Sequence, residues 1–160
     1  MTVMKKSASS QRRKLRFNTI PEAIAEAERI AALERAGAAH YAGNWNAGQI
    51  FNHLGAWAEY AFTGIPLRPP WFIRPFMRLM RGSMLRGMSA GRRIPNVKEG
   101  TLATEPADLE TGFARFKAAF ERLDRESPPP RHPFFGPMAH QDWKRLNLNH
   151  AELHFSFVKN

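Results

Sequence analysis

The sequence contains no cysteine among its 160 residues. The absence of cysteine excludes disulfide bonds, thiolate zinc sites and a cysteine nucleophile. It fits a reducing compartment, and we therefore expect a cytoplasmic protein. Any transition-metal site must use His, Asp or Glu side chains.

Long apolar runs are also missing. No stretch reaches about 18 uncharged apolar residues, so we expect no transmembrane helix. The pair Arg12-Arg13 is not followed by an apolar region, which argues against a secretion signal. At 160 residues the chain is long enough to bury a sizeable core. Its content of 43% hydrophobic residues fits a folded globular protein. We expect a disordered basic leader over residues 1–16 and one helical-bundle domain over residues 17–160.

Acidic residues are absent from two segments. Residues 1–21 carry six Lys or Arg, and residues 66–98 carry eight. The rest of the chain has ten basic and 14 acidic residues, so the net charge of +10 arises in these two segments. Both could simply be solvated. Alternatively, they contact an anionic partner, such as a lipid surface or nucleic acid.

Apolar residues at helical spacing predict four main helices. These cover about 20–36, 46–63, 104–124 and 139–158. Thr19 and Asn46 are suitable N-caps for the first two. In the third, Leu109, Phe113, Phe116, Phe120 and Leu123 repeat at steps of four and three, which indicates a core-facing seam. With no convincing strand, the pattern favours an all-α four-helix bundle.

The basic insertion at 66–98 mixes Arg with Trp, Phe, Leu and Met. It predicts a short amphipathic helix from about Pro75 to Met88. Such a helix commonly packs on its own domain, with Arg stems covering apolar surface. The same composition is also typical of helices that lie on a membrane or dock on a partner.

Three histidines form a candidate metal site. His150 and His154 are four residues apart, so a helix places both on one face. His53 follows the inward stripe of the helix at 46–63 and can supply a third imidazole. Three protein ligands with an open position are typical of catalytic metal sites, where water or a thiol cosubstrate can be activated.

Other interpretations of the histidines stay open. Core histidines are often only hydrogen-bonded, and the chain has three more. His132 could line the mouth of the site, whereas we expect His140 to be exposed and His40 to be structural. Further candidates for lining the cavity are Gln49, one turn before His53, and two tryptophans, Trp57 and Trp143. We expect Glu152 to point away from the site, at the surface.

Three motifs together resemble the DinB-like family of metal-dependent four-helix bundles. The stretch 45–54, WNAGQIFNHL, is similar to the family's W-s-x-x-x-x-l-x-H-l on helix two. The stretch 150–155, HAELHF, is similar to its final H-x-x-x-H-l. The stretch 132–136, HPFFG, followed by Trp143, is similar to a subgroup of unknown function.

The resemblance implies up-down-down-up connectivity, with the segment 64–104 as a long basic crossover between helices two and three. It also implies a divalent metal on His53, His150 and His154, with nickel or zinc as the first candidates and iron or manganese as further ones. Relatives include transferases and isomerases that use low-molecular-weight thiols. The chain departs from the pattern at Ala139, where a Ser or Thr helix cap is usual, and in its Arg- and Met-rich insertion.

We therefore favour a divalent-metal-dependent enzyme with a small-molecule substrate. Group transfer to a low-molecular-weight thiol is the first hypothesis, and metal-assisted hydrolysis is the second. The alternative is a non-enzymatic helical binding module, in which the basic tail and insertion contact an anionic lipid surface or nucleic acid. A homodimer is compatible with either hypothesis.

Overall fold

The computed structural model describes residues 12–160 and contains five α-helices within that range. The all-α class predicted from the sequence is confirmed. The helices are α2 (Ile20–Arg35), α3 (Ala47–Thr63), α4 (Arg74–Arg86), α5 (Leu109–Arg125) and α6 (His140–Phe155). A short 3₁₀ helix, η1 (Trp71–Ile73), leads into α4. In the same part of the chain, no helix is long and apolar enough to cross a membrane.

Two small antiparallel ladders were not predicted. β1 (His40–Tyr41) pairs with β4 (Val158–Lys159), and β2 (Arg131–His132) pairs with β3 (Gly136–Pro137). The prediction that the last helix continues to residue 158 is therefore wrong, because the chain leaves the helix after Phe155 to pair with β1. The ladder ties the end of the chain to the connection between α2 and α3.

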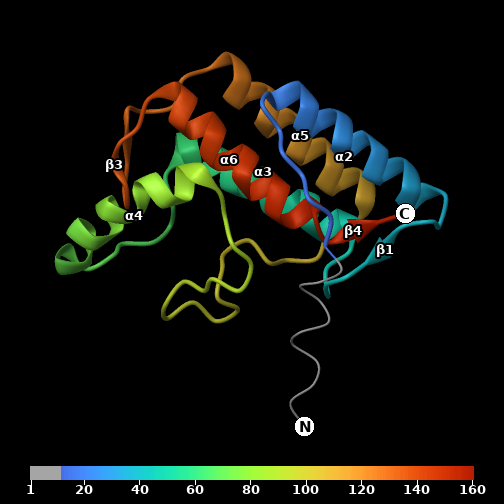
Figure 1. The fold of residues 1–160 in the computed structure, drawn as a ribbon, viewed down its shortest axis with the longest axis horizontal. Coiled ribbons are helices and arrows are strands. Elements are labelled where there is room, and N and C mark those ends of the chain that lie inside the picture. Colours follow the sequence, from blue (N-terminus) through green and yellow to red (C-terminus); the bar gives the residue numbers. More distant parts are fainter. Residues whose placement is uncertain (1–11) are drawn as a thin grey trace, which may run out of the picture.

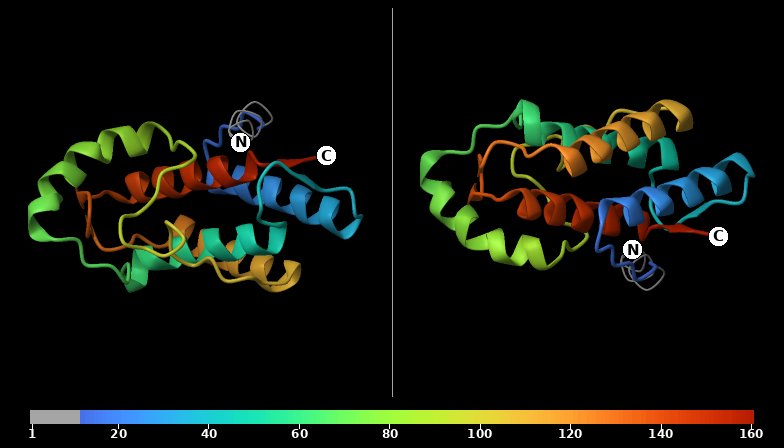
Figure 2. Two further views of the ribbon diagram at one scale, coloured as in Figure 1. Left: turned by 90° about the horizontal axis from the view of Figure 1, so that it is seen from below. Right: turned by 90° about the horizontal axis from the view of Figure 1, so that it is seen from above.

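Helices α2, α3, α5 and α6 pack against one another, and α4 lies at one end of the molecule (Figure 1). Seen from above and below, α4 lies beside α6 (Figure 2). The closest pair is α3 with α5. A Cβ atom on Gly112 would lie 2.3 Å from the carbonyl oxygen of Gly48, and one on Gly48 would lie 2.3 Å from that of Ala107. The two backbones can approach this closely because glycine has no side chain.

Helix starts follow their capping residues. Thr19 accepts a hydrogen bond from the backbone N–H of Glu22, and Asn46 accepts one from that of Gln49, as predicted. The third predicted helix begins at Leu109 rather than near residue 104, because Asp108 caps it by accepting from the N–H of Thr111. Ala139 has no capping oxygen, and Asp142 accepts from the Ala139 N–H instead.

The core confirms most of the predicted apolar faces. Phe116, Phe120 and Leu123 of the α5 seam are fully buried, while Leu109 and Phe113 are partly buried against the core. The aromatic side chains meet at the centre, where the rings of Phe51 and Phe155 contact that of Phe116. Burial of such rings stabilises the fold by about 2–3 kcal/mol per side chain.

The start of the described chain lies along α6. Of the predicted leader 1–16, residues 1–11 lie outside the described residues, and residues 12–16 pack on the bundle. The backbone N–H of Arg13 donates to the carbonyl of Ser156, and the guanidinium of Arg13 binds Glu26 and the carbonyls of Phe155 and Val158. The packed part of the chain therefore begins before residue 17.

Helix α4 is attached to α6 at two points. Arg81 forms an ion pair with Asp142 at the start of α6. Further along, the side-chain amide of Asn149 donates to the carbonyls of Met84 and Leu85 at 2.8 and 3.0 Å. The predicted helix in the basic insertion is thus present and fixed against the helix that carries His150 and His154.

Candidate metal centre

His53 on α3 and His150 and His154 on α6 meet in one cluster. The Nε2 atom of His150 lies 3.1 Å from Nε2 of His53 and 3.1 Å from Nε2 of His154. One ligand nitrogen from each ring lies within 4.8 Å of the other two. The structure therefore brings together the three histidines that the sequence had singled out, from two different helices.

The cluster lies at the edge of the core. His53 is fully buried, whereas His150 and His154 are partly exposed. A metal ion held there would be bound by the buried imidazole of His53 on its inner side. Solvent or substrate could reach it from the side of His150 and His154.

Two backbone carbonyls fix the tautomer of His53. Its Nδ1 atom lies 2.9 Å from the carbonyl oxygen of Leu102 and 3.2 Å from that of Ala103. Carbonyl oxygens only accept, so Nδ1 carries the proton and donates. In the neutral ring the lone pair is then on Nε2, the atom that faces the other two histidines.

The segment that supplies these carbonyls is held against α3. Gln49 donates its side-chain amide to the carbonyl of Thr104 at 2.8 Å, and Asn52 donates to that of Glu105 at 3.3 Å. Ala103 has a positive φ of 56°, an uncommon conformation for a residue with a side chain. Gln49 thus holds the segment that orients His53, and its hydrogen bond is to this segment rather than to His53.

Hydrogen bonds satisfy the three Nε2 atoms poorly. Each neutral Nε2 carries either a proton or a lone pair. If His150 donates to the lone pair of His53, it has no lone pair left to accept from His154, and its single N–H must be shared between both neighbours. If it accepts from His154, two lone pairs face each other between His150 and His53. One divalent cation would accept all three lone pairs and remove this conflict.

The electrostatics keep all three imidazoles neutral. Burial lowers the pKa of His53 to about 4, against the opposing effect of the two carbonyls. Although His150 and His154 are partly exposed, the protein atoms crowded around their rings displace water and lower the pKa of both far below the ordinary value, and the neighbouring imidazoles lower both further. At pH 7 the cluster is therefore in the ionisation state that binds metal.

Two tryptophans form walls around the cluster. The ring of Trp45 stacks on His154, with centroids 5.3 Å apart and planes 4° apart. Trp57 meets His150 edge-on at 5.8 Å, and its buried Nε1 atom has no hydrogen-bond partner among the described residues. Trp57 had been singled out as a lining residue. Trp45 begins the motif that contains His53 but was not among the predicted lining residues.

His132 and Trp143 contact each other in a separate cluster. Their rings lie 4.9 Å apart, and Nδ1 of His132 accepts from the backbone N–H groups of Phe134 and Phe135. The indole N–H of Trp143 donates to the carbonyl of Pro129. Both side chains thus organise the loop before α6, and their hydrogen bonds are made to that loop.

Three other expectations have different outcomes. His40, which was expected to be structural, is exposed in β1. His140 is partly buried rather than exposed, with Nε2 2.6 Å from the carbonyl of Leu123. The expectation that Glu152 lies at the surface is wrong. Its side chain is only 11% exposed, because it pairs with Arg145 and accepts from the backbone N–H of Phe17.

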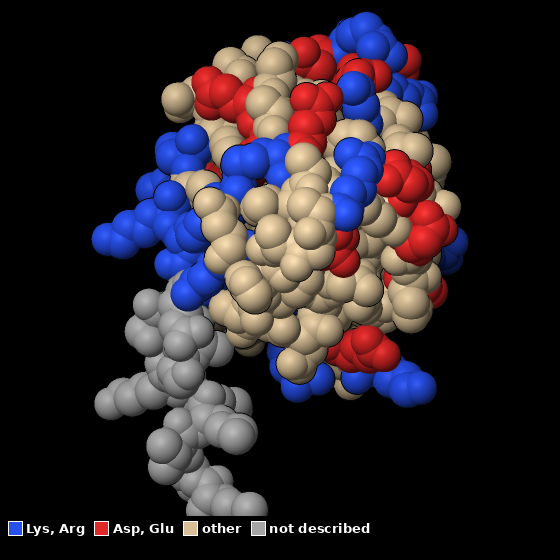
Figure 3. All heavy atoms as spheres, turned by 90° about the vertical axis from the view of Figure 1, so that its right-hand side faces the viewer, with Lys and Arg blue, Asp and Glu red and all other residues tan. Residues whose placement is uncertain are grey.

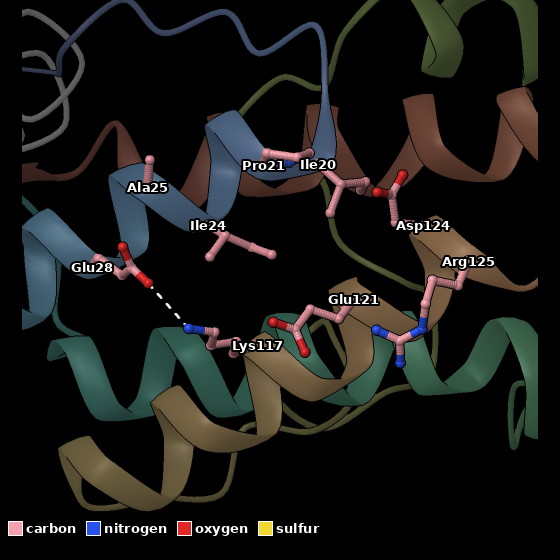
Figure 4. Close-up of a pocket in the computed structure, with 9 residues that line it drawn as sticks. All are labelled: Ile20, Pro21, Ile24, Ala25, Glu28, Lys117, Glu121, Asp124 and Arg125. Carbon is pink, nitrogen blue, oxygen red and sulfur yellow. Dashed lines mark hydrogen bonds and ion pairs between the residues drawn. The ribbon is translucent and has the colours of Figure 1, made fainter.

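A surface groove between α2 and α5 has a volume of about 390 Å³ and contains no histidine (Figure 4). An ion pair between Glu28 and Lys117 spans it at 3.2 Å. Both side chains are about half exposed, so this pair contributes little to stability. The groove offers no metal-binding nitrogen, and the histidine cluster remains the best candidate for chemistry.

Comparison with known families places the chain in a family whose description assigns no function. Residues 9–160 match the model of a family described as "Protein of unknown function (DUF1569)". The chain belongs to this family. Neither a curated protein nor a solved structure matches it. The family description carries no activity, so the argument for function depends on the histidine cluster.

Proposed function

We propose that this protein is a divalent-metal-dependent enzyme whose centre consists of His53, His150 and His154. The observation that carries the proposal is the convergence of three neutral Nε2 atoms, with His150 3.1 Å from each of the other two. Since a hydrogen-bonded network would have to share one N–H between both contacts, a cation explains the geometry better than a structural histidine network does.

The two Nε2 contacts of His150 are close to the ligand spacing of a metal site. Imidazole nitrogens bind zinc at about 2.0–2.1 Å, which places neighbouring nitrogens about 3.4 Å apart in a tetrahedral site. Small shifts of the three rings would bring the 3.1 Å contacts to this spacing. Imidazole ligands suit nickel and zinc, our first candidates, and iron or manganese are further ones.

The donor set favours an anion as the next ligand. Within the described residues, the cluster contains no carboxylate, so three neutral imidazoles would leave the charge of a divalent ion uncompensated. Such an ion supplies a Lewis acid that can activate a thiol or a water molecule at its open position. We therefore propose transfer of a group to a low-molecular-weight thiol as the first reaction, and hydrolysis of a small-molecule substrate as the second.

The protein's own groups would orient and shield this centre. The carbonyls of Leu102 and Ala103 hold His53 in the tautomer that leaves Nε2 free, a role that such partners often have in metal sites. Trp45 and Trp57 cover two sides of the imidazoles and would limit access of water. Substrate would then approach the partly exposed side, near His150 and His154.

A DinB-like bundle is the architecture we propose for this centre. Its support is the ligand order, with one histidine on α3 and two on α6, and the long crossover from Gly64 to Asp108 between α3 and α5. The up-down-down-up connectivity belongs to this proposal.

Metal analysis tests the site. We expect the purified, untagged protein to bind about one equivalent of nickel or zinc, and His150→Gln to lose it while keeping its helical circular dichroism. The matched control is His40→Gln, which removes an exposed histidine outside the cluster and should keep the metal. Metal at 100 times its Kd should stabilise the wild type by about 2.7 kcal/mol and His150→Gln by much less. Stoichiometric metal retained in His150→Gln would refute the assignment.

The reaction is tested with the same three proteins. Metal-loaded wild type should consume a low-molecular-weight thiol in the presence of a suitable electrophile, and His150→Gln should not. Turnover of the electrophile without thiol consumption would favour hydrolysis. If metal binds but neither reaction occurs with a broad panel, the enzymatic part of the proposal fails while the metal site stands.

A further inference from the structure

The strongly exposed large hydrophobic side chains of the described chain are concentrated in one place. They are Trp71, Phe72, Phe76 and Leu79, which are 78%, 65%, 61% and 81% exposed. All four belong to η1 and α4, and α4 lies at the lower left of the molecule in Figure 1. Scattered exposed hydrophobics are normal, but a cluster of this kind usually marks a contact surface.

Helix α4 has two apolar faces. The inner face packs on the protein core through partly buried side chains, namely Met77, Met84, Leu85 and Met88 just beyond its end. The outer face carries Phe76 and Leu79, which are three residues apart and therefore lie on one side, and the exposed Phe72 of η1 lies just before this helix in the chain. A surface helix that only covers its own core needs a single apolar face. The outer face therefore requires another explanation.

Four arginines lie around the start of this helix. Arg68, Arg74, Arg78 and Arg131 line a cavity of about 250 Å³ between the segment 67–69, α4 and the β2–β3 hairpin. None of the four forms an ion pair or side-chain hydrogen bond with any described residue. By contrast, Arg81 points inward and pairs with Asp142.

The charge here has one sign. Residues 66–98 contain no acidic residue, and the lining of the arginine cavity contains none either. The end of the molecule that carries β1 and β4 shows Lys and Arg next to Asp and Glu (Figure 3). The cavity and the outer face of α4 are therefore distinguished by unbalanced positive charge next to exposed aromatic and aliphatic side chains.

We propose that η1 and α4 dock this protein on an anionic phospholipid surface. Phe72, Phe76 and Leu79 enter the boundary between headgroups and acyl chains, and the four cavity arginines bind lipid phosphates. Arginine suits this role because its planar guanidinium can donate two parallel hydrogen bonds to a phosphate. An apolar face flanked by cationic side chains is the combination that holds interfacial helices on anionic membranes.

Charge argues against other occupants. A second copy pressed against the same face would bring Arg74 and Arg78 near their own counterparts, and neither residues 66–98 nor the cavity lining contains an acidic side chain to offset this repulsion. Nucleic acid would account for the arginines. It would leave Leu79, which is 81% exposed and offers no ring for base stacking, without a role.

Vesicle flotation with the 160-residue chain tests the proposal. We expect binding to phosphatidylcholine vesicles that contain phosphatidylglycerol, little binding to phosphatidylcholine alone, and weaker binding at high salt. The triple variant Phe72→Ser/Phe76→Ser/Leu79→Ser should lose about tenfold or more of this binding, although it keeps every basic residue. Arg74→Gln/Arg78→Gln should lose binding to a similar extent.

A matched control separates local charge from net charge. Arg35→Gln/Arg125→Gln removes the same charge from α2 and α5, and it should bind vesicles like the wild type. Unchanged binding of the serine triple variant would overturn the proposal, as would failure of the wild type to bind anionic vesicles. Two further results would also overturn it. One is a wild-type dimer that the serine variant converts to a monomer, without vesicle binding. The other is binding to DNA or RNA in place of vesicles.

Discussion

At the scale of single residues, His132 shows how a hydrogen-bond pattern fixes a protonation state. Its Nδ1 accepts from the N–H groups of Phe134 and Phe135, at 3.0 and 3.3 Å. A proton on Nδ1 would face these donors and break both bonds. Burial of the ring, which is 4% exposed, lowers its pKa from about 6.5 to about 4. His132 must therefore stay neutral in the folded protein.

We predict that this residue makes stability depend on pH. Between pH 6.5 and 4 the unfolded chain binds a proton that folded His132 does not, so stability falls as the pH falls through this range. The contribution lost between pH 7 and pH 5 is about 2 kcal/mol. His132→Asn keeps an acceptor near Nδ1 but does not titrate. In urea unfolding, the free energy of unfolding of the wild type should fall between pH 7 and pH 5 by about 2 kcal/mol more than that of this variant. Equal losses would contradict the prediction.

The histidine cluster itself could be predicted because its signal is local. The spacing of His150 and His154 places both on one helix face, and the apolar neighbours of His53 turn it inward. The carbonyls that orient His53 could not be predicted. Leu102 and Ala103 contribute only backbone atoms, which any residue has, and their position depends on how the crossover returns to α3.

At the scale of helices, the contact between α3 and α5 positions this crossover. Gly48 and Gly112 let the two backbones touch, directly beside the segment that anchors to Gln49 and Asn52. Arg115 of α5 also donates to the side-chain oxygen of Asn52 at 2.9 Å. The separation of α3 and α5 therefore sets the position of the carbonyls that hold His53.

We predict that Gly112→Ala separates these helices. Its Cβ would lie 2.3 Å from the carbonyl oxygen of Gly48, which forces a backbone shift at a cost of about 1–3 kcal/mol. The shift should also weaken metal binding by disturbing the 102–105 segment. Gly82→Ala in the middle of α4 is the matched control, since its Cβ would meet only Arg86, at 3.5 Å. In urea unfolding of both variants, Gly82→Ala should leave the free energy of unfolding unchanged or raise it slightly. Equal effects of both substitutions would refute the argument.

Helix existence could be predicted from apolar spacing, and the errors lie at helix ends. The third helix starts five residues later than predicted, at Leu109, because Asp108 provides a cap that the apolar pattern does not reveal. The last helix ends at Phe155 because Val158 pairs with Tyr41, a partner more than 100 residues away. Pairing over such a separation leaves no local pattern in a two-residue strand.

At the scale of the whole molecule, the described start of the chain joins the end of α6 to α2. Arg13 donates to the carbonyls of Phe155 and Val158, and it also pairs with Glu26 of α2 at 2.6 Å. A basic composition predicts a solvated leader. It does not reveal which arginine donates hydrogen bonds to the free carbonyls at a helix end. One side chain thus links three parts of the fold.

We predict that Arg13→Ala is more destabilising than its place in a basic segment suggests. The change leaves the partly buried carbonyls of Phe155 and Val158 without their donor, at a cost of about 1–3 kcal/mol. Arg35→Ala is the matched control, because it removes an exposed ion pair with Glu110 that contributes little to stability. Hydrogen exchange should also rise at β4 in Arg13→Ala alone. Equal, small losses in both variants would mean that the segment around Arg13 adds little to the stability of the bundle.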